Sequence, residues 1–246
     1  MQIKIEVSPR TVVRYLVMVV IFFSLVSTGI QICKYVFDYR DDWMKLFNLD
    51  RELNFPTWYS AFMIGFCAIL LRIIAVGKKQ QGDRYTKDWQ LLSVIFCFLA
   101  IDEVVSLHEI LIIPEVSEAL NLPWFLHSMW VIPGIVFIVW FIRRYSKFVH
   151  HLPVRSKQHF ISAACIYIGG ALIMEMIGSH FAESLGQQHL IYALIATAEE
   201  VLEMIGMIMF IYALLYYLSQ WAHQLDLQVD ILDSSLKYPK SNRGAS

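Results

Sequence analysis

The sequence predicts an all-α membrane protein, built as one domain of six transmembrane helices. Of its 246 residues, 57% are hydrophobic and only 17% are charged, whereas about 25% of the residues in a soluble domain are charged. The mean hydropathy of +0.53 agrees with this class. The apolar residues are gathered into separate runs long enough to cross a bilayer, and these runs predict the individual helices.

Each run is close to the ~20 helical residues that cross a hydrocarbon core of about 30 Å. The first run is too long for the apolar part of a signal peptide and no A-x-A site follows it, so we expect an uncleaved anchor. Pro114 is expected to end the third helix, and Pro133 to kink the fourth. The expected spans are about residues 13–33, 58–76, 89–113, 124–142, 160–181 and 190–218.

Lysine and arginine predict the orientation of these helices. They are frequent in the loops 77–88 and 143–158, and absent from the loops 114–122 and 182–188. Because short basic loops remain in the cytoplasm, we expect both chain termini there.

The two terminal segments alternate apolar and polar residues. Residues 1–9 show this pattern, and the cytoplasmic tail 221–246 repeats it around Leu225 and Leu227. A period of two is typical of a strand and predicts a small β-ribbon formed by the termini. Two disordered tails are the alternative.

The outer loop 34–57 combines aromatic residues with acids, among them Asp50 and Glu52. This composition is typical of a segment that lies in the membrane interface. We expect the two acids to be solvated unless the loop folds inward over the mouth of the bundle.

Ionisable residues lie inside three of the predicted spans, at similar depths in the outer half of the bilayer. No lysine or arginine lies at this depth, and carboxylates are costly in hydrocarbon. Protons or a metal ion must therefore neutralise them. The residues are Asp102, Glu103, His108 and Glu109 in the third span, Glu175 in the fifth, and Glu199, Glu200 and Glu203 in the sixth.

A metal site is the first interpretation of this constellation. Carboxylates with an imidazole suit iron, manganese or zinc, whereas an all-oxygen site suits magnesium or calcium. Glu103 or Glu175 would then act as a catalytic base. The Glu-x-x-His spacing of dinuclear carboxylate bundles is absent. The expected metal ligands are Asp102, His108, Glu109, Glu199 and Glu203. A hydrogen-bond network that only joins helices is the alternative.

Three segments resemble a widespread group of uncharacterised bacterial multipass membrane proteins. They are Leu49–Trp58 (LDRELNFPTW), Asp102-Glu103 with His108-Glu109, and Glu199-Glu200 with Glu203-Met204. The resemblance implies a bacterial inner membrane and adds weight to Glu52 and Asn54, but implies no activity. The three-histidine zinc pattern of the alkaline-ceramidase and progestin-receptor type hydrolases is not found.

Three functions remain open from the sequence. The preferred one is a metal-dependent enzyme acting on a lipid or another apolar small molecule that reaches the site from the membrane. The alternatives are a proton- or cation-coupled carrier or channel, and a non-catalytic membrane subunit or assembly factor. Haem ligation by His108 and His127 is a minor alternative, and the net charge of −1 gives no indication of nucleic-acid binding.

Overall fold

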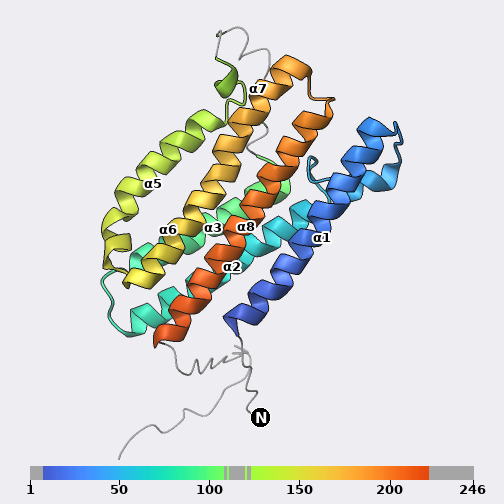
Figure 1. Cartoon of the computed structure of the whole chain (residues 1–246). Coiled ribbons are helices and arrows are strands. Elements are labelled where there is room, and N and C mark those ends of the chain that lie inside the picture. The colour runs from blue at the N-terminus through green and yellow to red at the C-terminus, as the bar shows by residue number, and fades with distance from the viewer. Residues whose placement is uncertain (1–7, 108–109, 111–119, 121–122, 222–246) are drawn as a thin grey trace, which may run out of the picture.

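A bundle of helices running up and down along one axis forms the molecule (Figure 1). The computed structural model describes residues 8–107, 110, 120 and 123–221. Every regular element in this described part is helical, which confirms the predicted all-α class. The proposed β-ribbon falls on residues outside the described ones. The elements are α1 (Pro9–Val36), η1 (Asp42–Leu46), α2 (Phe55–Gln80), α3 (Thr86–Val105), η3 (Trp124–Leu126), α5 (Val131–His151), α6 (Val154–Ile168), η4 (Gly169–Met174), α7 (Glu175–Leu185) and α8 (Leu190–Trp221).

Four helices are long and apolar enough to cross a membrane. They are α1, α2, α8 and the continuous helix formed by α6, η4 and α7. In a bilayer a helix satisfies its own backbone hydrogen bonds, which is why long apolar runs adopt this form. The more charged helices α3 and α5 lie alongside these four in the bundle (Figure 1).

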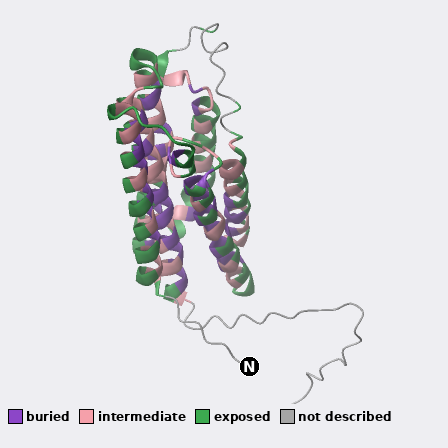
Figure 2. Cartoon of the chain, turned by 90° about the vertical axis from the view of Figure 1, so that its right-hand side faces the viewer, coloured by how far each residue is buried: buried purple, intermediate pink, exposed green. Residues whose placement is uncertain are grey.

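Helix α8 is the central element of the bundle. It packs against α1, α2, α6, η4 and α7. Buried residues line the inward faces of the helices, while exposed residues cover their outer faces (Figure 2). Outer faces rich in apolar side chains, such as Phe22 and Leu25 of α1, are typical of helices that contact lipid.

The bundle has two ends that differ in composition. The loop end carries residues 37–54 and 186–189. The basic end carries residues 81–85 and 152–153, and the flanking helix ends add Lys78, Lys79, Arg144 and Lys147 (Figure 1). Helix α1 begins and α8 ends at the basic end.

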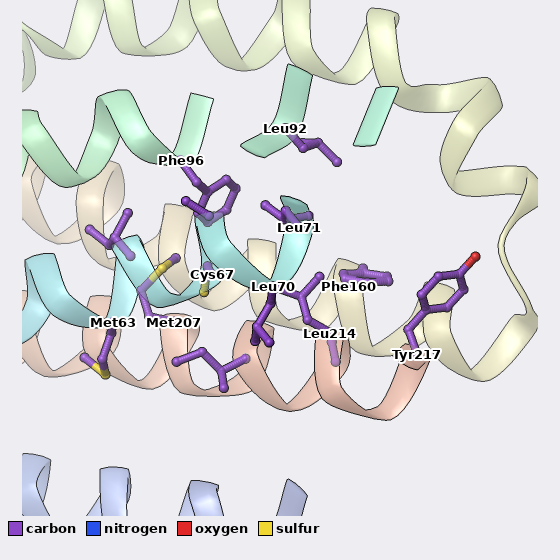
Figure 3. Close-up of a cluster of buried hydrophobic side chains, with 14 of the residues drawn as sticks. Met63, Cys67, Leu70, Leu71, Leu92, Phe96, Phe160, Met207, Leu214 and Tyr217 are labelled. Carbon is purple, nitrogen blue, oxygen red and sulfur yellow. The ribbon is translucent and has the colours of Figure 1, made fainter. Parts of the chain in front are cut away.

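The main hydrophobic core packs α2, α3, α6 and α8 together (Figure 3). On α2 it contains Met63, Cys67, Leu71 and Ile74, each with 0% exposure. From α8 it receives residues such as Met204, Ile211 and Leu214, and from α3 and α6 mainly aromatic rings. Fully buried apolar side chains therefore fill most of the described core.

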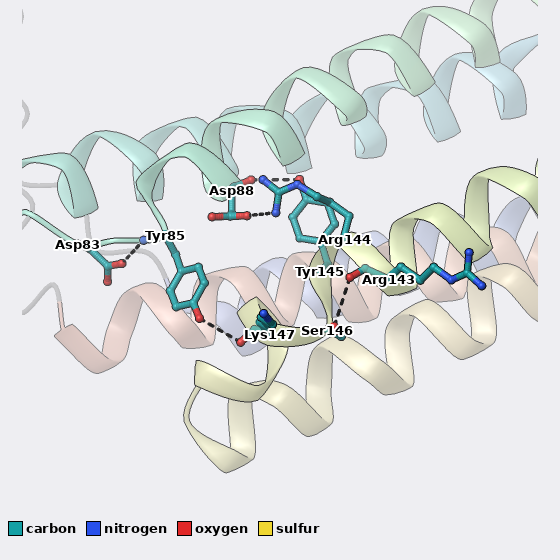
Figure 4. Close-up of polar contacts among 8 residues, drawn as sticks. All are labelled: Asp83, Tyr85, Asp88, Arg143, Arg144, Tyr145, Ser146 and Lys147. Carbon is teal, nitrogen blue, oxygen red and sulfur yellow. Dashed lines mark hydrogen bonds and ion pairs between the residues drawn. The ribbon is translucent and has the colours of Figure 1, made fainter.

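An ion pair fastens α5 to α3 near the basic end (Figure 4). The Arg144 guanidinium donates to the buried carboxylate of Asp88 over 2.5 Å, and the Tyr145 hydroxyl donates to the Asp88 carbonyl oxygen over 3.3 Å. Next to them the Tyr85 hydroxyl donates to the carbonyl oxygen of Lys147. These contacts join α5 to α3 together with the ring contacts of Phe148 with Tyr85 and Trp89.

Replacing Arg144 by glutamine is expected to lower the free energy of unfolding by about 1 kcal/mol, because Asp88 would lose its charged partner. Thermal unfolding of the purified protein in mild detergent measures this. Arg143→Gln is the matched control, since Arg143 is exposed and its guanidinium points away from Asp88 in Figure 4. Equal destabilisation by the two substitutions would contradict the role given to the ion pair.

The fourth predicted span was wrong in its bounds. It was expected over residues 124–142, but α5 begins at Val131 and continues to His151. Pro133 therefore lies in the first turn, where its missing N–H breaks no helical hydrogen bond, and not at a kink. Arg143 and Arg144 lie within the helix instead of in a loop.

Candidate functional site

Helix α3 ends inside the third predicted span. Its last residue is Val105, and Ser106 adopts a left-handed conformation with φ of 52°. The Ser106 N–H then bonds the Asp102 carbonyl oxygen over 2.6 Å and closes the helix. The expectation of one helix over 89–113 was therefore wrong. His108 and Glu109 lie outside the described residues.

Carboxylates from α3 and α8 meet near the middle of the bundle. The side chain of Glu200 has its strongest charge interactions with Glu203 and Glu103. That of Glu203 interacts most strongly with Glu103. We call the set of interacting carboxylates the carboxylate cluster. Its members are Glu103, Glu200 and Glu203, with Glu175, Glu199, Asp50 and Glu52 as described below. The structure thus brings together acids that are about 100 residues apart in the sequence.

Two hydroxyl groups complete this part of the cluster. Tyr167 of α6 makes a polar contact with the Glu203 carboxyl group. Ser60 of α2 makes one with Glu103. Four helices therefore contribute polar side chains to one place.

A second part of the cluster lies between α7 and α8. The side chains of Glu199 and Glu175 are in polar contact, and Glu199 also interacts with Glu203. The Ser128 hydroxyl donates a short hydrogen bond to Glu175, and Ser128 Oγ lies 3.0 Å from Ser179 Oγ. A pocket of about 40 Å³ is lined by these four residues and others, which is room for one or two water molecules.

The π-helical turn η4 sets the contact between this helix and α8. A β-carbon on Gly170 would lie 3.0 Å from the Glu199 carbonyl oxygen and from the Glu203 backbone nitrogen. Glycine suits this close approach, because a β-carbon would require η4 and the backbone that carries both glutamates to separate by a few tenths of an ångström. Such π-turns are frequent at functional sites.

The loop of residues 37–54, which precedes α2, is folded inward and joined to α1 by hydrogen bonds. We call it the pinned loop. Gln31 Nε2 donates to Asn48 Oδ1 over 2.6 Å, and the Leu49 N–H donates to Ser27 Oγ over 3.1 Å. Gln31 and Ser27 are fully buried. Buried polar side chains on a spanning helix are explained here by their partners in the loop.

Asn54 holds the same loop from its other end. Its side-chain oxygen accepts from the Thr57 N–H and caps α2, while Nδ2 donates to the carbonyl oxygens of Asn48 and Arg51. Its exposure is 5%. This accounts for the asparagine in the LDRELNFPTW segment, since asparagine combines a cap acceptor with a donor.

The pinned loop brings Asp50 and Glu52 to the carboxylate cluster. Glu52 accepts a hydrogen bond from the Thr57 hydroxyl over 3.3 Å, and it interacts with Glu103 and Glu200. Asp50 interacts with Glu200. The expectation that these loop acids are solvated was conditional on the loop staying outside, which it does not. The paired Asn48 and Asn54 were the available signal for an inward fold.

The structure brings some of the predicted site residues together but not all of them. It brings together Glu103, Glu175, Glu199 and Glu203, whereas Asp102 acts on the cluster through its neighbour Glu103. Sequence reasoning did not select Tyr167, Ser60 or Ser128. In the described part of the chain, no three or more His, Cys, Asp or Glu side chains are arranged to hold a metal ion.

Comparison with known families assigns the chain to one of them. The model of the family described as Domain of unknown function (DUF8692) matches residues 12–218. The chain belongs to this family. The match runs from α1 into the last turn of α8, so the family includes every helix that contributes to the cluster. This confirms the expected membership of an uncharacterised family. No curated protein and no solved structure matches the chain.

Proposed function

We propose that this member of the DUF8692 family is a membrane-embedded enzyme that depends on a divalent cation and acts on a lipid or another apolar substrate. The supporting observation is the convergence of carboxylates from α3, α8, α7 and the pinned loop onto one place. We further propose that α3 and α5 also cross the membrane, with the basic end in the cytoplasm of a bacterial cell.

Electrostatics supports a cation at this place. The strongest charge interactions of Glu200 are with four other carboxylates, and such a set requires protons or a cation in an apolar surrounding. Glu103, Glu200, Glu203 and Glu52 are the residues that would have to draw together around it, because the described side chains are not arranged as a metal site. Oxygen ligands alone suit magnesium, calcium or manganese, while His108 would extend the range to iron and zinc. A bound cation would supply Lewis acidity and an activated water.

The residues around the cluster have separate roles in this proposal. Tyr167 donates its hydroxyl hydrogen to Glu203 and so orients that carboxylate. The Ser128 hydroxyl donates to Glu175 and orients it next to the small polar pocket, where Glu175 can accept a proton from a reacting water. In this proposal Glu175, the base, is therefore not one of the residues that would hold the cation.

The hydrophobic core favours an enzyme over a carrier. A carrier needs a polar route from the cluster toward the basic end, but α2 and α8 continue there with fully buried apolar side chains such as Met63, Met204 and Ile211. A site that is bordered on this side by buried apolar side chains suits a substrate that enters and leaves through the other side or from the lipid.

Elemental analysis of protein purified in mild detergent without chelators tests the proposal. We expect a stoichiometric divalent metal in the wild-type protein and a loss of about tenfold or more in Glu203→Gln. Glu183→Gln is the matched control, because Glu183 is an exposed glutamate on α7, and it should retain the metal. Metal-free wild-type protein, or full retention in Glu203→Gln, would contradict the proposal. If the variant only loses thermal stability, the cluster is a structural network.

A further inference from the structure

A cleft of about 530 Å³ opens at the loop end, apart from the carboxylate cluster. It lies between the last turns of α1, the loop 37–54 and Gln188 of the α7–α8 connection. Ile30 and Met44 give it apolar walls, and Asn48 forms part of its lining. Its volume is in the range of sites for small organic molecules.

Positive charge dominates this cleft. Lys34, Arg40, Lys45 and Arg51 line it together with Asp41 and Asp42. Asp42 is paired with Lys45 over 2.6 Å, and this hydrogen bond lowers the pKa of Asp42. Asp41 caps η1 by accepting from the Trp43 N–H.

Two of the cations are available to a ligand. Arg40 pairs with Asp38 over 3.7 Å, whereas Lys34 and Arg51 have no carboxylate partner among the described residues. The backbone of Arg51 is held, because its carbonyl oxygen accepts from Asn54 Nδ2 over 2.7 Å, while the residue is exposed. A guanidinium and an ammonium that line one cleft are the donor types that bind phosphate.

The surroundings of the cleft favour a phosphate carried by a lipid. Lys34 lies in the last turn of α1, which is long and apolar enough to span a membrane. The outer face of α1 below it exposes Leu25 and Ile32, and Trp43 of the loop is 47% exposed. Acyl chains could therefore lie along α1 while the headgroup occupies the cleft.

We propose that this cleft binds the phosphate of a phospholipid headgroup through Lys34 and Arg51. The inference deepens the proposed function and rests on it in one respect, namely that the bound lipid is the substrate. Arg51 lies between Asp50 and Glu52 in the chain, and both of these acids interact with Glu200, so the loop that lines the cleft also contributes to the carboxylate cluster. The substrate class would then be anionic phospholipids.

Titration of the full-length protein in mild detergent with dihexanoyl phosphatidylglycerol tests the inference, with tryptophan fluorescence as the readout. The double variant Lys34→Gln/Arg51→Gln should bind at least about tenfold more weakly than wild type, since both charged contacts are lost. The matched control Lys79→Gln/Arg143→Gln removes two exposed cations toward the basic end and should change affinity less than about twofold. Equal binding by both double variants would overturn the proposal.

Two further measurements are needed. One distinguishes a lipid phosphate from free phosphate, and the other tests the cleft assignment independently of the proposed metal-dependent function. Inorganic phosphate should compete only at a concentration about 100-fold higher, because it lacks the acyl chains; competition at equal concentration would overturn the assignment to a lipid. The titration is repeated with Glu203→Gln. We expect unchanged lipid binding there, so a protein that binds lipid but no metal refutes the proposed function and leaves the cleft assignment intact.

Discussion

Replacing Asn54 by alanine is expected to lower the free energy of unfolding by about 3 kcal/mol. The cap of α2 accounts for about 1–2 kcal/mol of this. The remainder arises because the carbonyl oxygens of Asn48 and Arg51 would lose their buried donor. Thermal and chemical unfolding in mild detergent measure the change. Asp50 and Glu52 should then leave the carboxylate cluster together with the loop.

Asn54→Ser separates the two roles of this residue. Serine keeps a cap acceptor for the Thr57 N–H but cannot reach the two carbonyl oxygens, so we expect it to lose about half as much stability as alanine does. Metal content, measured in parallel, should fall in both variants if Glu52 takes part in holding the cation. A stability within about 0.5 kcal/mol of wild type for Asn54→Ala would show that the loop is held by other contacts.

Replacing Gly206 by alanine is expected to cost about 2 kcal/mol. The new β-carbon would lie 2.7 Å from the backbone nitrogen and the β-carbon of Tyr167. Backbone atoms cannot turn aside, so α6 and α8 must move apart. The helix-propensity gain of about 1 kcal/mol for alanine over glycine offsets part of the cost. This separation also moves the Tyr167 hydroxyl away from Glu203.

Gly169→Ala is the matched control for this substitution. Gly169 lies in the same helix as Tyr167, but a β-carbon there meets nothing within 4 Å. The control should be neutral or slightly stabilising, whereas Gly206→Ala should unfold at a lower temperature and bind less metal. If the two variants behave alike, the close approach of α6 to α8 is not required for the site.

The distribution of apolar residues predicts most of the helices but not all of their ends. The runs of α1, α2 and α8 were placed to within a few residues, because a bilayer-spanning run has to form a helix of known length. The end of α3 at Val105 was missed, because the apolar run of the sequence continues past this residue. In the structure the backbone becomes left-handed at Ser106 and the helix ends there.

The candidate site likewise contains residues that the sequence could select and residues that only the structure identifies. Its glutamates on α3, α7 and α8 could be selected from the sequence because ionisable groups in apolar runs are rare and costly. Tyr167 and Ser128 could not, since a tyrosine or serine at such a position is ordinary. Their roles follow from contacts with Glu203 and Glu175 on other helices.

The sequence by itself determined the helical class, the approximate helix positions and the presence of unbalanced acids in apolar segments, because these depend on composition and on the short range of helical hydrogen bonds. Only the tertiary structure decided that the loop acids Asp50 and Glu52 join the helical ones. That outcome depends on the hydrogen bond between Gln31 and Asn48 and on the bonds of Asn54 to the loop carbonyl oxygens. The bond between Gln31 and Asn48 joins residues far apart in the chain, and no local pattern determines it.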